Sequence, residues 1–191
     1  MFDLIDQNVL RKIHLSEAEL AHFHTFLRPK TLRKKEFFQR AGEVTQAVAF
    51  VSKGILRSYS IDKKGEEQIM QFAPEDWWIS DIYSGLTGKQ SQLFIDAMED
   101  SEILILGQDV NEKLYLEIPA FERYFRILAQ NRFLTLQERI SNALNETAEQ
   151  KYRHFLEKYP TLPQRVPQHQ IASYLGIQPE TLSRLRRKKG A

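Results

Sequence analysis

The spacing of apolar residues changes along the chain and divides it into three regions. Residues 4–28 carry apolar positions at three- and four-residue spacing, which is typical of amphipathic helices. Residues 30–107 instead hold short β-rich runs bounded by turn residues such as Gly42, Gly54 and Gly65. Helical spacing returns at Pro119. The pattern predicts an α+β protein.

The first region is predicted to form two short helices. The order Ser16-Glu17-Ala18-Glu19 has the spacing of a capping box, so the second helix is expected to begin there and to end at Pro29. His22 and His24 are two residues apart, and such positions do not face each other on a helix. We therefore expect no metal site at these histidines.

The second region has the strand spacing of a β-sandwich or barrel. Runs rich in β-branched and aromatic residues recur at intervals of roughly 8–12 residues. The expected strands are 31–38, 47–51, 55–61, 66–72, 93–97 and 101–106.

A long helix is expected from Pro119 to about Leu144. Its apolar stripe is Phe121, Tyr124, Phe125, Leu128, Leu136, Ile140 and Leu144, and Arg132 interrupts it. A helix of about 25 residues is ~37 Å long, which exceeds what one small β-domain needs. Part of the stripe is therefore expected to pair with a second copy of the chain, and the alternative is a helix packed wholly within its own chain.

Two short helices joined by a tight turn are predicted near the end of the sequence. They follow a helix at 147–159 and a connector at 160–167. Pro167 is expected at the first helical position, Gly176 at the turn in left-handed conformation, and Pro179 at the start of the last helix. Leu182 and Leu185 then lie on one face of that helix.

The opposite face of the last helix is polar and basic. Residues 161–191 contain six basic residues against one acidic residue, Glu180, although the whole chain has a net charge of only +2. Short polar groups and arginine suit base edges in a DNA major groove, and basic groups suit phosphates. The predicted DNA-binding residues are Gln168, Gln178, Glu180, Thr181, Ser183, Arg184, Arg187 and Lys188. An ordinary basic helix with a solvated face is the alternative.

Two stretches carry a resemblance to a known family. The stretch VPQHQIASYLGIQPETLSRLRRK, residues 166–188, resembles the helix-turn-helix of the Crp/Fnr family of bacterial transcription regulators. The stretch VSKGILRSYSIDKKGEEQIMQF, residues 51–72, is similar to the cyclic-nucleotide-binding β-roll of the same family. The resemblance implies base-reading roles for Glu180 and Arg184, and it places Pro179 where some members carry another base-reading arginine.

The resemblance also implies a domain organisation. Residues 1–118 would form a double-stranded β-helix or jelly roll of the cyclic-nucleotide-binding type, and residues 119–144 the dimerisation helix. Residues 145–191 would form a winged-helix-type helix-turn-helix domain. Because the connector has only eight residues, the hairpin wing is expected to be minimal or missing.

The nucleotide pocket that the resemblance implies lacks its cation. Nucleotide-binding members use a Gly-Glu pair and, ten residues later, an Arg-Ser/Thr pair; counting without gaps places these on Ser80-Asp81 and Ser91-Gln92. Asp81 keeps an acceptor for a ribose hydroxyl, but Ser91 is neutral, so a phosphate would be repelled. We therefore expect no cAMP binding.

Two alternatives remain for what occupies this pocket. It binds another small ligand through Ser80, Asp81, Tyr83, Ser91 and Gln92, or side chains fill it, for which Trp77, Trp78, Tyr83 and Phe94 are candidates.

Composition excludes several functional classes. The sequence has no cysteine, which removes disulfides, thiol catalysis and cysteine-ligated zinc or iron–sulfur clusters. We find no nucleophile–base pair and no glycine-rich phosphate loop, so no enzyme and no cofactor are expected. No signal peptide or membrane span is recognised, which favours a cytoplasmic protein.

The expected partners are double-stranded DNA, a second copy of the chain and, for an activator, RNA polymerase. The alternative is a small-ligand-binding module whose basic tail contacts a protein or RNA.

Overall fold

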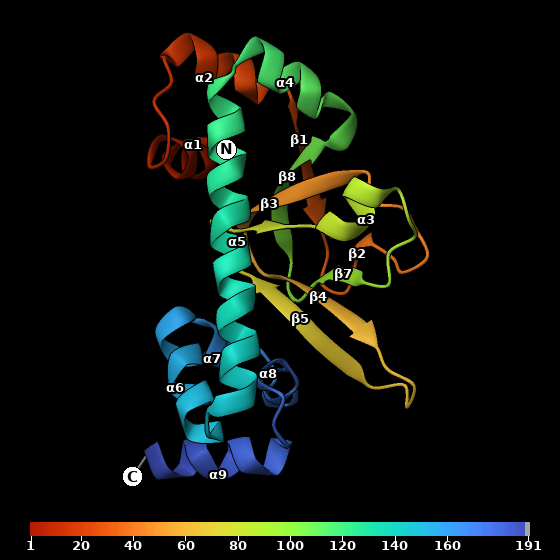
Figure 1. The fold of residues 1–191 in the computed structure, drawn as a ribbon, viewed down its shortest axis with the longest axis vertical. Helices are drawn as coiled ribbons and strands as arrows, with labels where there is room; N and C mark the ends of the chain where they lie inside the picture. The colour runs from red at the N-terminus through yellow and green to blue at the C-terminus, as the bar shows by residue number, and fades with distance from the viewer. Residues whose placement is uncertain (190–191) are drawn as a thin grey trace.

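A β-sandwich lies beside a long helix, with short helices gathered at both ends of that helix (Figure 1). The computed structural model describes residues 1–189, and the side chains of 188 and 189 lie outside the described part. The helices are α1 (Asp3–Leu10), α2 (Glu17–His24), α3 (Ile82–Thr87), α4 (Asn111–Glu117), α5 (Ala120–Asn145), α6 (Ala148–Lys158), α7 (Leu162–Arg165), α8 (Gln168–Leu175) and α9 (Pro179–Lys189).

Two antiparallel sheets form the sandwich. Their strands are β1 (Leu27–Leu32), β2 (Phe37–Gln39), β3 (Ala47–Lys53), β4 (Leu56–Ile61), β5 (Glu67–Ala73), β6 (Trp78–Ile79), β7 (Phe94–Ala97) and β8 (Ser101–Gly107). The sheet orders are β1-β8-β3-β6 and β2-β7-β4-β5. In the first sheet Ala49 of β3 lies opposite Ile105 of β8, and in the second Leu56 of β4 lies opposite Ala97 of β7. The predicted β-sandwich is confirmed.

Aliphatic side chains fill the space between the two sheets. Ala49 and Val51 of β3 and Ile95 and Ala97 of β7 contribute to this core from alternate positions, as a sandwich requires. The buried cluster consists of Leu32, Ala49, Val51, Leu56, Ala73, Ile79, Ile95, Ala97 and Ile103. The core of the sandwich is therefore apolar.

The first helical region ends earlier than predicted. The capping box at Ser16 and Glu19 is confirmed, but α2 ends at His24 and β1 already begins at Leu27. Pro29 lies inside β1, opposite Leu104, rather than after a helix. Proline removes a backbone donor, and β1 tolerates it because β1 is an edge strand.

The apolar stripe of α5 consists of two faces rather than one. Phe121 and Tyr124 are buried against α1, α2 and the first sheet. Further along, Leu136, Ile140 and Leu144 are 39%, 65% and 79% exposed. At 3.6 residues per turn these later positions lie on a different side of the helix from the buried ones. The helix thus packs within its chain over its first half and leaves an apolar face open over its second half.

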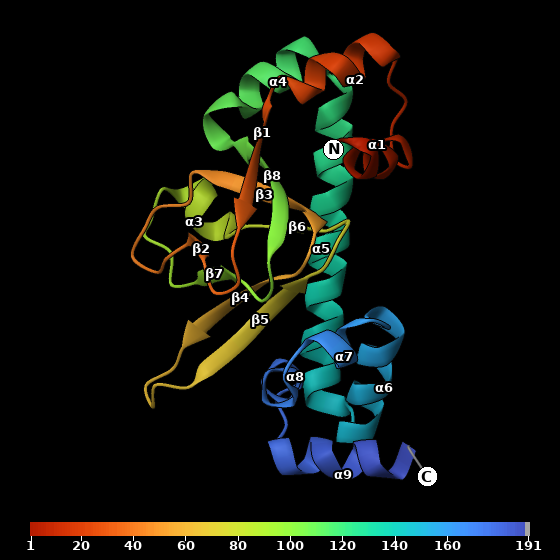
Figure 2. The ribbon, with the colours of Figure 1, turned by 180° about the vertical axis from the view of Figure 1, so that it is seen from behind.

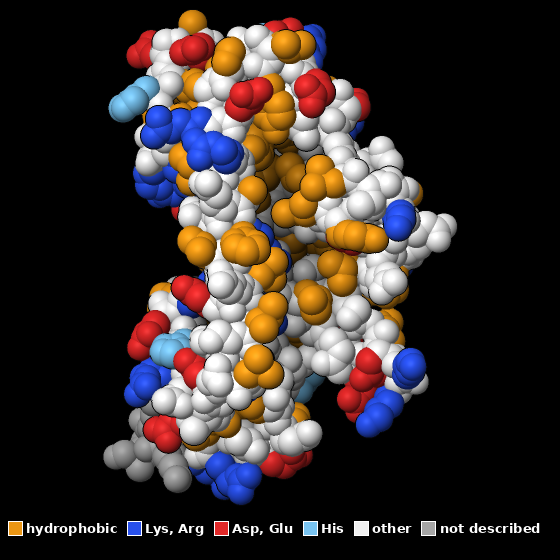
Figure 3. Space-filling view, in the orientation of Figure 1, with side chains coloured by type: hydrophobic (Ala, Val, Ile, Leu, Met, Phe, Trp, Pro, Cys, Tyr) orange, Lys and Arg blue, Asp and Glu red, His pale blue; other side chains and the backbone are white. Residues whose placement is uncertain are grey.

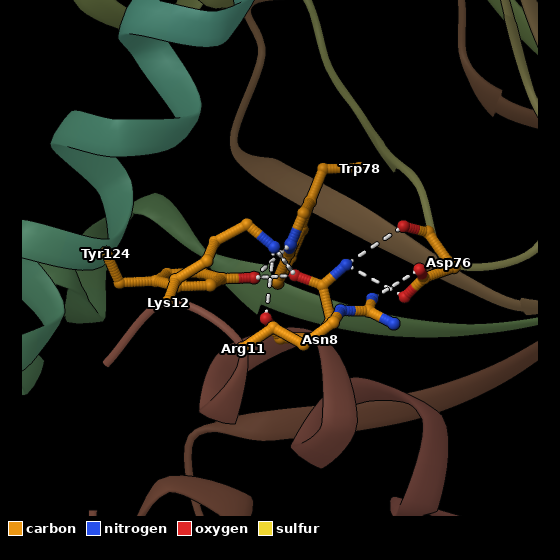
Figure 4. Close-up of polar contacts among 6 residues, drawn as sticks. All are labelled: Asn8, Arg11, Lys12, Asp76, Trp78 and Tyr124. Atoms are coloured by element: carbon orange, nitrogen blue, oxygen red, sulfur yellow. Dashed lines mark hydrogen bonds and ion pairs between the residues drawn. The ribbon is translucent and has the colours of Figure 1, made fainter. Parts of the chain in front are cut away.

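A polar network joins α1, α5 and the turn after β5 (Figure 4). The Trp78 indole Nε1 donates to the Tyr124 hydroxyl over 2.8 Å, and that hydroxyl donates to Asn8 Oδ1 over 2.8 Å. Asn8 Nδ2 donates to Asp76 Oδ1 over 2.8 Å, and Arg11 forms an ion pair with the same carboxylate. These bonds fix the first helix to the long helix.

The helices after α5 share a hydrophobic core with the second sheet. Ile55, Tyr59, Ile69 and Phe72 of the sheet side pack with residues of α6 to α9. The Ser173 hydroxyl of α8 accepts from Ile69 N over 3.0 Å and donates to Glu67 O over 2.7 Å. Seen from behind, α6, α7 and α8 gather at the lower half of α5, with α9 beneath them (Figure 2). In the described residues β8 is the last strand, so a hairpin wing is absent there.

Candidate nucleic-acid interface

The turn between α8 and α9 has the geometry that the sequence predicts. Gly176 ends α8 with φ +65°, a left-handed conformation that glycine adopts without a Cβ clash. Ile177 N then donates to Ala172 O over 3.0 Å, and α9 begins at Pro179. The prediction for Pro167 was wrong by one residue, because Pro167 has an extended ψ of 138° and caps α8, which begins at Gln168.

Leucines hold α9 against the rest of the molecule. Leu182 is fully buried, and Leu185 packs on the same cluster, which includes Ile171 and Ala172. Burial of one face fixes which side chains of the helix face solvent. The predicted placement of both leucines on one face of the helix is confirmed.

The residues opposite these leucines form an open polar surface. We call Gln178, Glu180, Thr181, Ser183, Arg184 and Arg187 the α9 polar face; Gln178, Glu180, Arg184 and Arg187 are exposed, and Thr181 and Ser183 are half-buried. Arg184 Nη2 donates to the Thr181 hydroxyl and Arg187 Nη2 to the Ser183 hydroxyl, each over 3.3 Å. Neither arginine forms an ion pair within residues 1–187. Basic side chains are visible at this end of the molecule (Figure 3).

Two further predicted DNA-binding residues lie outside the α9 polar face. Gln168 is exposed at the first position of α8. The side chain of Lys188 lies outside the described residues.

Arg165 contributes to docking rather than to the basic surface. It forms ion pairs with Glu75 at 2.7 Å and with Glu99 at 2.5 Å, both on the β-sandwich. Partial burial works to raise the pKa of the Glu75 carboxyl. Hydrogen bonds from Arg165 and from Gly54 N outweigh burial and hold this pKa below its usual range. The sequence-based count of basic residues therefore included one that is neutralised, and its partners lie too far along the chain for a local pattern to show.

The two key residues of the predicted effector pocket bind each other. The Ser91 hydroxyl donates to Asp81 Oδ2 over 2.7 Å, and both residues are buried. Asp81 Oδ1 accepts from Ser84 N over 3.2 Å, which caps the first turn of α3. We call this arrangement the Asp81–Ser91 pair; its carboxylate has internal partners on both oxygens.

The other pocket candidates do not converge on this pair. Tyr83 is 62% exposed and Gln92 is exposed. The Ser80 hydroxyl donates to Ala47 O over 3.3 Å.

The aromatic residues considered as pocket filling have other neighbours. Trp77 packs on Tyr159 with ring centroids 5.3 Å apart, and Phe94 stacks on Tyr59 at 5.3 Å, both where the sheet meets the C-terminal helices. Trp78 bonds to Tyr124 of α5.

A buried arginine that the sequence did not single out lies on β4. Arg57 donates to both oxygens of Asp96, over 2.8 and 3.1 Å, and also binds Glu67. Burial works to lower the pKa of Arg57, but these carboxylates raise it above its ordinary value. The charge of Arg57 is therefore already balanced by two carboxylates.

The histidines of α2 form ion pairs rather than a metal site. His22 pairs with Glu117 and His24 with Asp6, as separate two-residue contacts. No group of three or more metal-ligating side chains is found among residues 1–187. No helix in the described part is long and apolar enough to cross a bilayer.

Sequence comparison finds similar regulators in other bacteria. No protein-family model matches the chain. The chain is 26% identical over 183 residues to the fumarate and nitrate reduction regulatory protein of Vibrio cholerae, covering 90% of the chain and 72% of that protein. It is 27% identical over 183 residues to the regulatory protein HlyX of Actinobacillus pleuropneumoniae, covering 90% of this chain and 75% of HlyX. It is 28% identical over 171 residues to the transcriptional activator protein Anr of Pseudomonas protegens, covering 83% of this chain and 68% of Anr.

Solved structures share the fold. FixK2 from Bradyrhizobium japonicum matches with a TM-score of 0.74 at 19% identity, over 85% of this chain and 83% of that chain. A CooA mutant from Carboxydothermus hydrogenoformans matches with a TM-score of 0.69 at 20% identity, over 95% of this chain and 82% of the CooA chain. The arrangement of β-sandwich, long helix and helix-turn-helix is common to them, and the relatives by sequence are regulators rather than enzymes. In sequence the chain is thus similar to bacterial transcription regulators, and its fold is that of the Crp/Fnr regulators among the solved structures.

Proposed function

We propose that this regulator binds DNA sequence-specifically as a homodimer and that the α9 polar face reads the bases. The observation that carries the proposal is the contrast between the two sides of α9. Leu182 is fully buried behind the helix, while Glu180 and Arg184 project from it without an ion-pair partner in the described residues. A helix held in this way presents its polar side chains to a major groove.

Each residue of the face has a role that its chemistry suggests. Arginine donates two hydrogen bonds to the major-groove edge of guanine, and glutamate accepts from cytosine N4, so we assign base reading to Arg184 and Glu180. Gln178, Thr181 and Ser183 offer shorter contacts to bases or phosphates. We assign phosphate contacts to Arg187, Lys188 and Gln168.

The open half of α5 supports the homodimer. Phe133, Leu136, Ile140 and Leu144 are 67%, 39%, 65% and 79% exposed on this helix. Apolar side chains also gather along this side of the molecule in Figure 3. A second α5 would cover the face, and two copies of α9 would then meet successive major grooves about 34 Å apart.

We assign the division of labour to residues 1–118 as sensor, 119–144 as dimerisation helix and 145–191 as DNA-binding domain. Because the Asp81–Ser91 pair is closed on itself, the β-roll pocket is proposed to be degenerate and not to bind cAMP; a different small effector fits the proposal. No cofactor is assigned. A regulator of this kind would act in the cytoplasm and, as an activator, would also contact RNA polymerase.

Binding-site selection from random duplexes tests this function. Purified protein should enrich a palindrome whose half-sites are separated by about one helical turn. Retention that disappears with rising salt for all sequences alike would instead favour a ligand-binding module with a basic tail for a protein or RNA. Sedimentation of the Ile140→Asp variant, with Leu116→Asp on α4 as control, should show loss of the dimer in the first variant only.

A further inference from the structure

A large cavity lies where the β-sandwich meets the C-terminal helices. Its volume is about 860 Å³, and its walls come from β5, α5, α6 and α8. Sites for small molecules commonly measure roughly 300–1,000 Å³. None of the predicted DNA-binding residues lines it, and neither does the Asp81–Ser91 pair.

Three cations gather at this cavity. Arg139 of α5 and Lys158 of α6 line it, and Arg132 lies close enough to both to influence their charges. The pKa of Lys158 is lowered by desolvation and then by repulsion from Arg132 and Arg139; Glu138 opposes this with a smaller effect. Desolvation also lowers the pKa of Arg132. At Lys158 the repulsion from the two arginines therefore exceeds the attraction to Glu138.

Arg139 and Lys158 contact aromatic rings rather than carboxylates, and Arg139 also donates to a backbone carbonyl. The Arg139 guanidinium lies 4.4 Å from the Tyr174 ring centroid and donates to Met70 O. The Lys158 ammonium lies 5.6 Å from the ring centroids of Trp77 and Tyr159. None of the three cations forms an ion pair within residues 1–187. Contacts of this kind orient a charge without neutralising it.

The remaining walls combine apolar surface with further charged residues, namely Lys151 and the carboxylates of Glu138, Glu146 and Glu157. Ile69, Met70, Phe155 and Leu175 provide the apolar part. Among the acidic lining residues, Glu146 is already paired with His154 at 3.0 Å. Such a site suits a molecule with an anionic group and a small organic body.

We propose that this cavity binds a small organic phosphate, with the phosphate against Arg139 and Lys158 and the organic part against the apolar wall. Arginine and lysine form charge-assisted hydrogen bonds with phosphate oxygens. The site goes beyond the proposed DNA function. Since its walls come from both the sheet and the helix-turn-helix side, an occupant would stabilise the docked arrangement of the two.

Titration of the full-length protein without DNA tests the proposal. Phenyl phosphate and inorganic phosphate are added at constant ionic strength, and tryptophan fluorescence is followed, because Trp77 is 5.3 Å from Tyr159. Phenyl phosphate should give a saturable change at lower concentration than inorganic phosphate. Arg139→Gln and Lys158→Gln should each raise its Kd about tenfold, the effect of losing one charge-assisted contact.

The control is Lys113→Gln on α4, outside the cavity, which should leave the Kd unchanged. Thermal unfolding followed by circular dichroism checks that the variants fold, and phenyl phosphate should raise the melting temperature of the unmodified protein but not of Lys158→Gln. The absence of a saturable signal, equal affinity for inorganic phosphate, or an unchanged Kd in both variants would overturn the proposal. None of these readings depends on DNA binding.

Discussion

The α9 polar face and the Asp81–Ser91 pair are both sets of polar side chains, but their surroundings are opposite. Arg184 and Glu180 are exposed, and no ion pair involves them in the described residues. Asp81 and Ser91 are 7% and 3% exposed and bond to each other over 2.7 Å. Polar groups with internal partners stabilise a fold, whereas groups held outward by apolar packing stay available to a partner.

The surroundings of the Asp81–Ser91 pair explain why its two side chains bind each other. A buried carboxylate without a cation needs hydrogen-bond donors, and Ser91 and Ser84 N supply them. The four predictions below test each side of the comparison.

Leu182→Ala should have the largest effect, because it removes the packing that holds α9 in place. Truncating a fully buried leucine costs about 2–5 kcal/mol of stability. Urea unfolding measures the loss, and Leu116→Ala, at an 81% exposed leucine, is the matched control. Equal losses in both variants would show that α9 does not depend on this leucine.

Asp81→Ala should destabilise the β-sandwich without weakening DNA binding. The change removes the cap of α3 and the partner of Ser91, for an expected loss of about 2–3 kcal/mol. Thermal unfolding and DNA affinity at low temperature measure the two effects, with the exposed Asp109→Ala as control. A loss of affinity in folded protein would assign a signalling role to the Asp81–Ser91 pair.

Arg184→Ala should weaken DNA binding without destabilising the protein, the reverse of Asp81→Ala. Stability should be unchanged, while affinity falls by about 1–3 kcal/mol at one base pair of each half-site and preference for that base disappears. Competition against operators with single substitutions measures this, and Arg33→Ala, exposed at the β1–β2 turn, is the control. A uniform loss across all operators would make Arg184 a phosphate contact.

Added cAMP should have the smallest effect, because we expect it to leave the melting temperature unchanged. Asp81 has no cationic neighbour bound to it among residues 1–187, so a phosphate near it would be repelled. Differential scanning calorimetry at micromolar cAMP checks the melting temperature. A rise of several degrees would mean that the Asp81–Ser91 pair opens to admit the nucleotide.

Local signals in the sequence were sufficient for much of the fold. Gly176, Pro179 and the spacing of Leu182 and Leu185 are all neighbours in sequence, and the helix-turn-helix geometry follows from them. Five of the six predicted strands were also found, because alternation and turn glycines are local; the strand predicted over 31–38 was wrong, since β1 ends at Leu32 and β2 begins at Phe37 after a turn. The boundary near Pro29 was not predictable, since a proline fits both the end of a helix and an edge strand.

Contacts between distant residues were beyond the sequence. Arg165 meets Glu75 across 90 positions, and no spacing rule connects them. The change of face on α5 depends equally on where the β-sandwich ends beside it. The closed Asp81–Ser91 pair needed the fold to bring α3 and the following loop together.

The short turn from Glu75 to Trp78 contacts both ends of the molecule through alternating side chains. Glu75 and Trp77 contact Arg165 of α7 and Tyr159 at the end of α6, whereas Asp76 and Trp78 hold Asn8 and Tyr124 at the opposite end. Asp76 has φ +72°, a strained value for a residue other than glycine, so its bonds to α1 maintain the shape of the turn. Releasing α1 would remove the bonds that hold this turn, so the packing of the C-terminal helices against Glu75 and Trp77 depends in part on the first helix.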